Sequence, residues 1–346
     1  MKNKEPIDYE ELEEILAAHA LWLAGKDGGT RADLSGRDLK ETGALAGARL
    51  ERAVLDRCDL SAVDLRDADL RRASLVDANL FGADLRRADL SFADCTGCYV
   101  SEADLRGSRL IGAVFFGAGL LFANMSESTA DHLLAEEADF TGVRMKSASM
   151  RDAQLRGACF DRSSIKESDL SRSDFTSATF ADARVSSSNL AGANLTDAYF
   201  ENCNLSSSIL RDAILEEAFF PGADLSLCDL RGSSAKAAHL SHSDLSRCNM
   251  QGLDLEGVVM TDVDLTGAEM TDINARHAFI VDSDLRGAVL SRADLTGTAL
   301  RYSGLDGADL DGALLDGADL FGTGMGGMPA GDRLLDGCIG RPDEEA

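Results

Sequence analysis

The chain has 346 residues, of which 34 are basic and 60 are acidic, so its formal net charge is −26. This acidity argues against direct binding of DNA, RNA or an anionic membrane, because all three carry negative charge. No apolar run is as long as a transmembrane helix, and no signal sequence is recognised, so we expect a soluble, cytoplasmic protein.

The first predicted element is an amphipathic helix between Asp8 and Lys26. Its apolar residues recur at helical spacing: Leu12, Ile15, Leu16, Trp22 and Leu23. Asp8 and Glu11 stand in capping-box positions, and Gly25 stands where a helix would end. We expect residues 1–30 to form a capping helix over the element that follows. Docking of a partner protein is the alternative role.

A five-residue repeat follows, over residues 31–325. From Leu45 to Met325 there are 57 positions at intervals of five ((325 − 45)/5 + 1), and 52 of them hold Leu, Ile, Val, Met or Phe. Two residues before these central positions, 50 of the 57 residues are Ala, Ser, Cys, Thr or Gly. Neither a helix nor a strand keeps both sets on one side. A solenoid that turns every five residues does, and its coils bury their apolar side by stacking.

Phenylalanines in the repeat predict the number of sides of each coil. Five of them stand at intervals of 20 residues: Phe140, Phe160, Phe180, Phe200 and Phe220. A column stacked at this interval requires coils with four sides of five residues, and 57 units then make about 14 coils.

Three irregularities interrupt the repeat. The step from Leu39 to Leu45 is six residues, which predicts a bulge near Glu41 to Ala44. Residues 126–138 have alanine at two central positions and the helix-like run DHLLAEEA, so an extruded loop is expected there, with distorted coils as the alternative. Further along, Leu253, Val258, Val263 and Ile273 occupy small inward positions. Flexible Met and small Ala at the nearby central positions predict local repacking.

The runs ADLRD ADLRR and GADLD GALLD are tandem A(D/N)LXX units. This pattern resembles the pentapeptide-repeat family over about Arg31 to Met325. The resemblance implies a right-handed quadrilateral (four-sided) parallel β-helix, an all-β solenoid with an N-terminal α-helical cap. Residues 326–346 would form a Gly-rich, acidic C-terminal tail or cap. Some bacterial members mimic DNA, bind DNA gyrase or topoisomerase IV, and dimerise through their C-terminal ends. The C-terminal end here lacks a clear helical face, which leaves a homodimer open.

The sequence predicts no catalytic, metal or cofactor site, and therefore no enzyme. Cys95 and Cys98 form a CxxC, but no second pair exists and both fall on inward positions, so we interpret them as buried structural residues. A redox or zinc role is the alternative. His239 and His242 form a lone HxxH, interpreted as two solvated side chains. Free interior thiols are typical of a reducing cytoplasm.

Acidic side chains are unevenly distributed along the repeat. Residues 251–346 contain 6 basic and 19 acidic side chains, a net charge of −13. In the first half, an Arg stands two residues after each member of one aspartate column: Asp64, Asp84 and Asp104. In the second half, Ser or Thr replaces this Arg after three members of the same column, Asp224, Asp244 and Asp264, and an Arg returns only after Asp284. We call these last four residues the acidic ladder.

Apolar side chains also stand at outward positions. One column, called here the aromatic strip, consists of Tyr199, Phe219, His239, Val259 and Phe279. A line of outward apolar groups is typical of a docking surface. A second predicted cluster, beside the expected loop, consists of Phe81, Phe92, Tyr99, Ile111, Phe116, Leu121 and Phe122.

Two functions remain open from these surfaces. The first is a non-enzymatic protein-binding scaffold, a rigid acidic rod that presents the aromatic strip and its acidic C-terminal half to a protein partner. The alternative is a DNA mimic that binds DNA gyrase or topoisomerase IV, which would inhibit the enzyme or protect it from quinolones or toxins. Rows of carboxylates can imitate the phosphates of duplex DNA for a basic groove.

Overall fold

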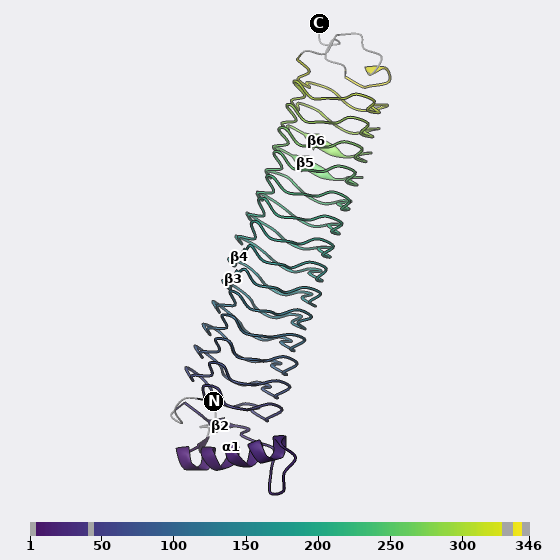
Figure 1. The fold of residues 1–346 in the computed structure, drawn as a ribbon. Helices are drawn as coiled ribbons and strands as arrows, with labels where there is room; N and C mark the ends of the chain where they lie inside the picture. The colour runs from purple at the N-terminus through teal and green to yellow at the C-terminus, as the bar shows by residue number, and fades with distance from the viewer. Residues whose placement is uncertain (1–4, 41–44, 327–334, 341–346) are drawn as a thin grey trace. The chain divides into compact units, whose positions relative to one another are not determined.

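A computed structural model describes residues 5–40, 45–326 and 335–340 of the chain (Figure 1). The chain divides into two compact units, Met1–Asp174 and Phe175–Ala346. Each unit is built from stacked coils.

Unit 1 begins with the predicted helix. Helix α1 spans Tyr9–Leu23, and the Asp8 carboxylate at its N-cap accepts a hydrogen bond from the Glu11 N–H at 2.8 Å. Gly25 follows the helix with a φ of 62°, a left-handed conformation that glycine adopts readily. The Glu11 side chain pairs with Arg37 at 2.5 Å instead of completing a capping box. The prediction of a helix in this region is confirmed.

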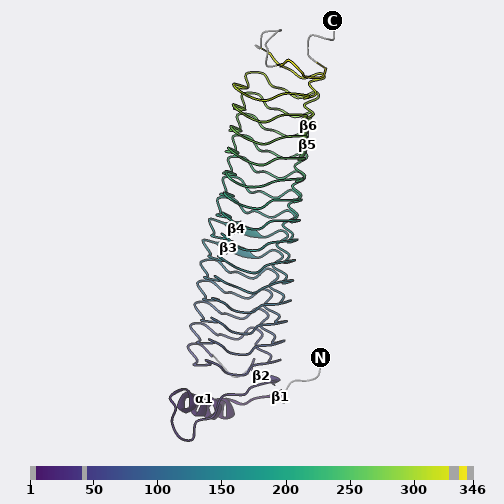
Figure 2. The same ribbon diagram turned by 90° about the vertical axis from the view of Figure 1, so that its right-hand side faces the viewer.

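Helix α1 lies across the end of the first coil of unit 1 (Figures 1 and 2). Leu12 and His19 are its buried residues, and the Ala18 carbonyl accepts a hydrogen bond from the Thr30 N–H at 3.1 Å. Strand β1 (Glu5–Pro6) pairs in parallel with β2 (Arg37–Asp38). These contacts tie the N-terminal segment to the first turn of the solenoid.

Most five-residue units of the coils share one backbone conformation, which the unit at Leu50 illustrates. The Leu50 carbonyl accepts a hydrogen bond from the Ala53 N–H at 2.9 Å, and within this turn Arg52 has a φ of 61°. A positive φ only at the third residue of the turn defines a type II turn, which explains why glycine is frequent at this position. The Leu50 N–H then donates to the Asp69 carbonyl of the next coil at 2.8 Å. Strands are therefore minimal: most sides contribute one residue to a parallel ladder.

The pairing register confirms coils of 20 residues. Asp33 pairs with Val54, an offset of 21, whereas Arg49 pairs with Asp69, an offset of 20 that continues through unit 1. The extra residue therefore lies between Leu39 and Leu45, as the sequence predicts. The predicted bulge itself, Glu41 to Ala44, lies outside the described residues.

Large residues fill the interior at the predicted interval. Every fifth residue from Leu45 to Leu320 is buried. Phe140 stacks on Phe160 in unit 1 with ring centroids 4.6 Å apart. In unit 2, Phe200 stacks between Phe180 and Phe220 at 4.7 Å on each side. These rings confirm the 20-residue columns that the sequence predicts.

Some of the small inward residues also donate hydrogen bonds to backbone carbonyls of the preceding coil. Ser168 donates its hydroxyl to the Met145 carbonyl of the preceding coil at 2.9 Å. Cys98 occupies the equivalent position, and its Sγ lies 2.8 Å from the Leu75 carbonyl oxygen. Serine and cysteine are therefore interchangeable here, because each is small and carries a donor that reaches the coil before it.

Longer strands occur at a few sides of the coils. In unit 1, β3 (Arg144–Lys146) pairs in parallel with β4 (Ser164–Lys166). In unit 2, β5 (Val259–Thr261) pairs in parallel with β6 (Phe279–Val281). The enlarged inward residues of unit 2 are all buried: Leu253, Val258, Val263 and Ile273.

The expectation of an extruded loop at 126–138 is wrong. These residues keep the turn-and-bridge pattern, and Thr129 and Leu134 pair with residues 20 positions away on both sides. The large Leu133 is buried beside Ala130 and Ala135, so large and small residues have exchanged places and the interior volume is maintained. Five-residue periodicity outweighs the helix-like composition of this segment.

Backbone pairing with the last coil also occurs beyond Met325, where the repeat is predicted to end. Ile339 pairs in parallel with Asp319, again at an offset of 20, and its carbonyl accepts a hydrogen bond from the Leu320 N–H at 2.9 Å. Residues 335–340 therefore stack on the preceding coil, and the assignment of residues 326–346 to a tail or cap stays a prediction. The rest of that segment, beyond Gly326, lies outside the described residues.

We expect the substitution Phe180→Ala to lower the free energy of unfolding by about 3 to 5 kcal/mol, because it removes a fully buried ring from the column of unit 2. Denaturant unfolding would measure this loss. The matched control is Phe81→Ala, whose ring is 47% exposed and whose loss should be small. A loss below about 1 kcal/mol for Phe180→Ala would contradict its place in a stacked interior column.

His19 gives the N-terminal end of unit 1 a dependence on pH. Its ring is fully buried, and Nδ1 accepts a hydrogen bond from the Ala32 N–H at 3.1 Å. Burial lowers the pKa of His19 below its ordinary value of 6.5. Three charged residues also act on it: Arg31 and Arg49 lower the pKa, and Glu51 raises it. The neutral ring therefore stabilises the fold fully above pH 6.5, and this contribution is lost as the pH falls toward the folded-state pKa.

Protonation of His19 at Nδ1 would remove the acceptor of the Ala32 N–H. We therefore expect the exchange rate of the Ala32 amide, after correction for intrinsic exchange, to rise severalfold as the pH falls from above 6.5 through the folded-state pKa of His19. The single tryptophan, Trp22, stacks on His19 at 5.5 Å, so its fluorescence should change over the same pH range. In the variant His19→Gln both changes should disappear, whereas they should persist in His242→Gln. Persistence in His19→Gln would contradict this assignment.

Candidate protein-binding surfaces

The structure places the aromatic strip in one line on unit 2. Tyr199, Phe219, His239, Val259 and Phe279 form consecutive parallel pairs from coil to coil. Phe219 stacks on His239 with ring centroids 4.5 Å apart and planes 6° from parallel. Phe219 is 41% exposed and Phe279 is 55% exposed. At the start of the line, the Tyr199 hydroxyl donates to Glu201 at 2.8 Å. The strip is thus a continuous, ordered and partly apolar surface.

The acidic ladder lies on the next face of the same coils. Asp224, Asp244, Asp264 and Asp284 also pair consecutively in parallel. Asp244 accepts a hydrogen bond from the Ser246 N–H, and Asp264 accepts one from the Thr266 N–H, both at 2.8 Å. Within the described part of the chain, Asp284 alone among these four carboxylates has an ion pair, with Arg286 at 2.5 Å. The prediction that their counter-charges disappear is therefore confirmed for three members.

The corresponding face of unit 1 is neutralised. Asp64 binds Arg66 through two hydrogen bonds of 2.8 and 2.6 Å, and the pairs at Asp84 and Asp104 repeat this geometry. The Arg66 guanidinium lowers the pKa of Asp64 to about 2. The same aspartate column therefore presents carboxylates paired with arginines in unit 1, whereas in unit 2 Asp224, Asp244 and Asp264 have no ion pair among the described residues.

The second group of apolar residues does not form one cluster. Phe92 and Ile111 lie at one corner of the coil, as their positions in the 20-residue register show, whereas Phe81, Leu121 and Phe122 lie ten residues away in that register, at the opposite corner. Gly112 leaves room for the Phe92 ring, and Gly142 for the Phe122 ring. Closeness in sequence suggested a cluster, but successive five-residue units face different directions.

The histidine and cysteine motifs do not converge on a site. Cys95 and Cys98 are buried, and the hydrogen bond between their thiols together with burial raises the pKa of Cys95, which disfavours the thiolate needed for redox or zinc chemistry. His242 pairs with Asp262 at 3.1 Å, while His239 stacks on Phe219. No group of three potential metal ligands occurs among the residues that the structure describes. An apolar interior void near Ala235 has a volume of about 10 Å³, too small for a substrate.

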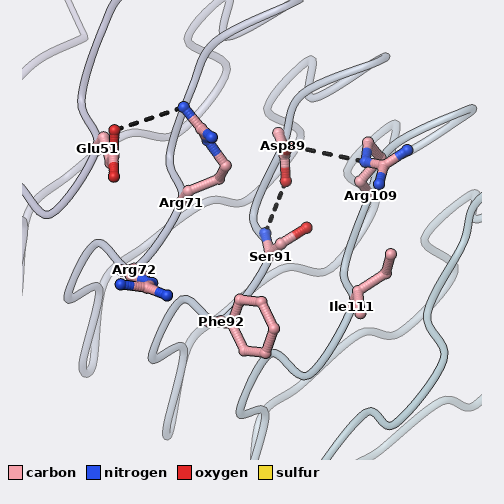
Figure 3. A pocket seen from close by; sticks show the side chains of 8 residues that line it. All are labelled: Glu51, Arg71, Arg72, Asp89, Ser91, Phe92, Arg109 and Ile111. Carbon is pink, nitrogen blue, oxygen red and sulfur yellow. Dashed lines mark hydrogen bonds and ion pairs between the residues drawn. The ribbon is translucent and has the colours of Figure 1, made fainter.

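A charged hollow on unit 1 is a feature that the sequence analysis missed. It has a volume of about 410 Å³ and combines three arginines, two acidic residues, a serine and two apolar residues (Figure 3). Its lining residues are Glu51, Arg71, Arg72, Asp89, Ser91, Phe92, Arg109 and Ile111. Four of these stand 20 residues apart, so sorting the sequence by coil position would have brought them together.

The three arginines of the hollow differ in the number and length of their ion pairs with carboxylates. Arg71 binds Asp69 at 2.6 Å and also reaches Glu51 at 3.4 Å. Arg109 has a long ion pair of 3.7 Å to Asp89. Arg72 has no carboxylate partner within the described residues, and its guanidinium lies 5.8 Å from the centre of the Phe92 ring. The hollow therefore holds cationic groups whose hydrogen-bonding capacity is partly unused.

The five-residue repeat matches a known protein family. A family model described as Pentapeptide repeats (8 copies) matches residues 44–72, 58–91, 93–129, 134–162, 193–232, 223–262, 238–274, 268–301 and 293–323. No functionally curated protein matches the chain. No helix among the described residues is long and apolar enough to cross a membrane.

Several solved structures are similar. HetL, a pentapeptide repeat protein involved in heterocyst differentiation regulation in the cyanobacterium Nostoc sp. strain PCC 7120, is 30% identical over 70% of this chain and 89% of its own, with a TM-score of 0.27. QnrB1, a plasmid-mediated fluoroquinolone resistance protein, is 20% identical over 52% of this chain and 91% of its own, with a TM-score of 0.30. The family model matches most of the five-residue repeat, and the backbone pairing has the 20-residue register of four five-residue units. This chain therefore belongs to the pentapeptide repeat family.

Proposed function

We propose that this protein is a non-enzymatic scaffold that binds a protein partner through the aromatic strip of unit 2. The observation that supports this most is the register of the strip, which holds exposed and half-buried side chains in one line on consecutive coils. Aromatic residues dominate the energy of many protein interfaces. Because the backbone beneath them is fixed by hydrogen bonds between coils, little entropy would be lost when a partner binds.

Electrostatics favour a basic partner for unit 2. Residues 175–346 contain 11 basic and 28 acidic side chains, a net charge of −17, whereas residues 1–174 contain 23 and 32, a net charge of −9. The acidic ladder stands on the face beside the aromatic strip. A partner with a basic rim around an apolar groove would match both features, and its association would be accelerated by charge.

We further propose that α1 and the first residues of the chain act as a cap, as expected for the end of a solenoid. An uncovered coil would expose interior apolar residues and unpaired backbone groups. The buried Leu12 and His19, and the hydrogen bonds from Thr30 and Ala32, support this role.

The scaffold proposal predicts that replacing Tyr199, Phe219 and Phe279 together by Ser weakens partner capture at least tenfold. The loss follows from removal of three interface side chains of the type that carries most binding energy. Quantitative pull-down with immobilised protein, followed by mass spectrometry, would measure it. The matched control replaces Phe81, Phe116 and Phe122 of unit 1 by Ser, which should leave capture unchanged. If every partner of the unaltered protein stays bound to the strip variant, the strip is not the interface.

The second candidate function is that of a DNA mimic that binds a type II topoisomerase. The observation that favours it is the unpaired state of Asp224, Asp244 and Asp264, because successive coils hold these carboxylates about 4.8 Å apart. Basic DNA-binding grooves recognise rows of negative charge and backbone shape. This function needs the ladder, whereas the scaffold function needs the strip.

Purified DNA gyrase provides the test of the mimic. The protein should inhibit supercoiling, or protect the enzyme from a quinolone, and replacing Asp224, Asp244 and Asp264 by Asn should reduce this effect at least tenfold. The matched control carries Asn at Asp64, Asp84 and Asp104, whose charges are already paired with arginines. Absence of any effect of the unaltered protein, or equal effects of both variants, would rule out the mimic.

A further inference from the structure

We propose that the charged hollow of unit 1 is a second binding site, which takes an acidic segment of a partner protein with a carboxylate beside an apolar side chain. This site does not depend on the aromatic strip. Its ligand would have the opposite charge to a ligand of unit 2, so the two proposals can fail separately.

Unused positive charge in the hollow is the first argument. Elsewhere on unit 1, several arginines are held by carboxylates at 2.6 Å, as Arg66 and Arg87 are. In the hollow, the ion pair of Arg109 is 3.7 Å long, and Arg72 has no carboxylate partner among the described residues. A guanidinium offers five donors in a planar fork that fits a carboxylate through two hydrogen bonds. Two arginines that line the hollow are in this state, and each of them favours an incoming carboxylate.

The apolar wall is the second argument. Phe92 is 58% exposed, and its ring is held between the Arg72 guanidinium and Gly112 of the next coil. A Cβ atom at Gly112 would lie 2.8 Å from the ring, so glycine at this corner allows the ring to lie where it does. Ile111 extends the apolar surface of the hollow (Figure 3). An apolar side chain next to the bound carboxylate would cover this surface.

The shape of the hollow indicates an extended peptide segment as the ligand. Glu51, Arg71, Ser91 and Ile111 come from four consecutive coils, which are about 4.8 Å apart, so the hollow runs for about 14 Å along the stack. This length matches about four residues of extended chain. A nucleic acid or an anionic membrane is disfavoured, because the net charge of −26 would repel a polyanion far beyond the hollow itself.

Binding of fluorescein-labelled peptides, measured by fluorescence anisotropy on the full-length protein, tests this site. The probe is the peptide GSEFEEFEGS, and its matched control is GSQFQQFQGS, in which every carboxylate side chain is replaced by an amide. We expect the acidic probe to bind at least tenfold more tightly than the amide peptide, and its affinity to fall with increasing salt.

Replacement of Arg72 and Arg109 together by Gln should weaken binding of the acidic probe about tenfold or more. The control variant carries Gln in place of Arg156 and Arg162, which lie outside the hollow. It should bind the acidic probe with the affinity of the unaltered protein. Circular dichroism and thermal unfolding of each variant would show that the fold is retained. The strip variant described above should also bind the acidic probe normally, which separates this site from the proposed interface of unit 2.

Three results would overturn the proposal. The first is equal affinity for the acidic and amide peptides. The second is unchanged affinity in the Arg72 and Arg109 variant. The third is a response to inorganic phosphate in titrations followed by NMR, without binding of the acidic peptide, which would show an anion site that does not accept a peptide segment.

Discussion

Hydrogen bonding between backbones of successive coils is the constraint on which the rest of this structure depends. Each side of a coil donates to and accepts from the coils before and after it, as Leu50 and Asp69 do, so a residue is fixed above its partner 20 positions earlier. One coil alone would leave these groups unpaired and its apolar side chains exposed. Stacking therefore supplies both the hydrogen bonds and the core, and neither forms without the other.

This constraint explains why different residue types are tolerated at the same inward position. Ser168 and Cys98 serve the same purpose, because a small side chain with a donor reaches the carbonyl of the preceding coil. Leu133 can occupy a small position because alanines stand at the neighbouring central positions. Volume and polar pairing must be conserved within a coil, but the identity of each residue need not be.

The same constraint organises the surface. Each outward position recurs at every coil, so similar residues at the same position of consecutive coils form a line on the surface. The acidic ladder and the aromatic strip arise in this way on adjoining faces of unit 2, and the charged hollow arises in unit 1. Each proposed binding surface is therefore a place where the side chains of a column differ from the paired aspartates and arginines seen at Asp64, Asp84 and Asp104.

The sequence by itself determined the five-residue unit, the coil of 20 residues, the phenylalanine columns and the terminal helix, because these follow from periodicity and local capping. It also identified the ladder and the strip, since their members share one column. Only the tertiary structure decided that 126–138 stays in the coil, that pairing reaches Ile339, and that Arg72, Phe92 and Arg109 surround one hollow. These outcomes depend on contacts between neighbouring columns and coils, where side-chain volume and ion-pair geometry in three dimensions outweigh local sequence preference.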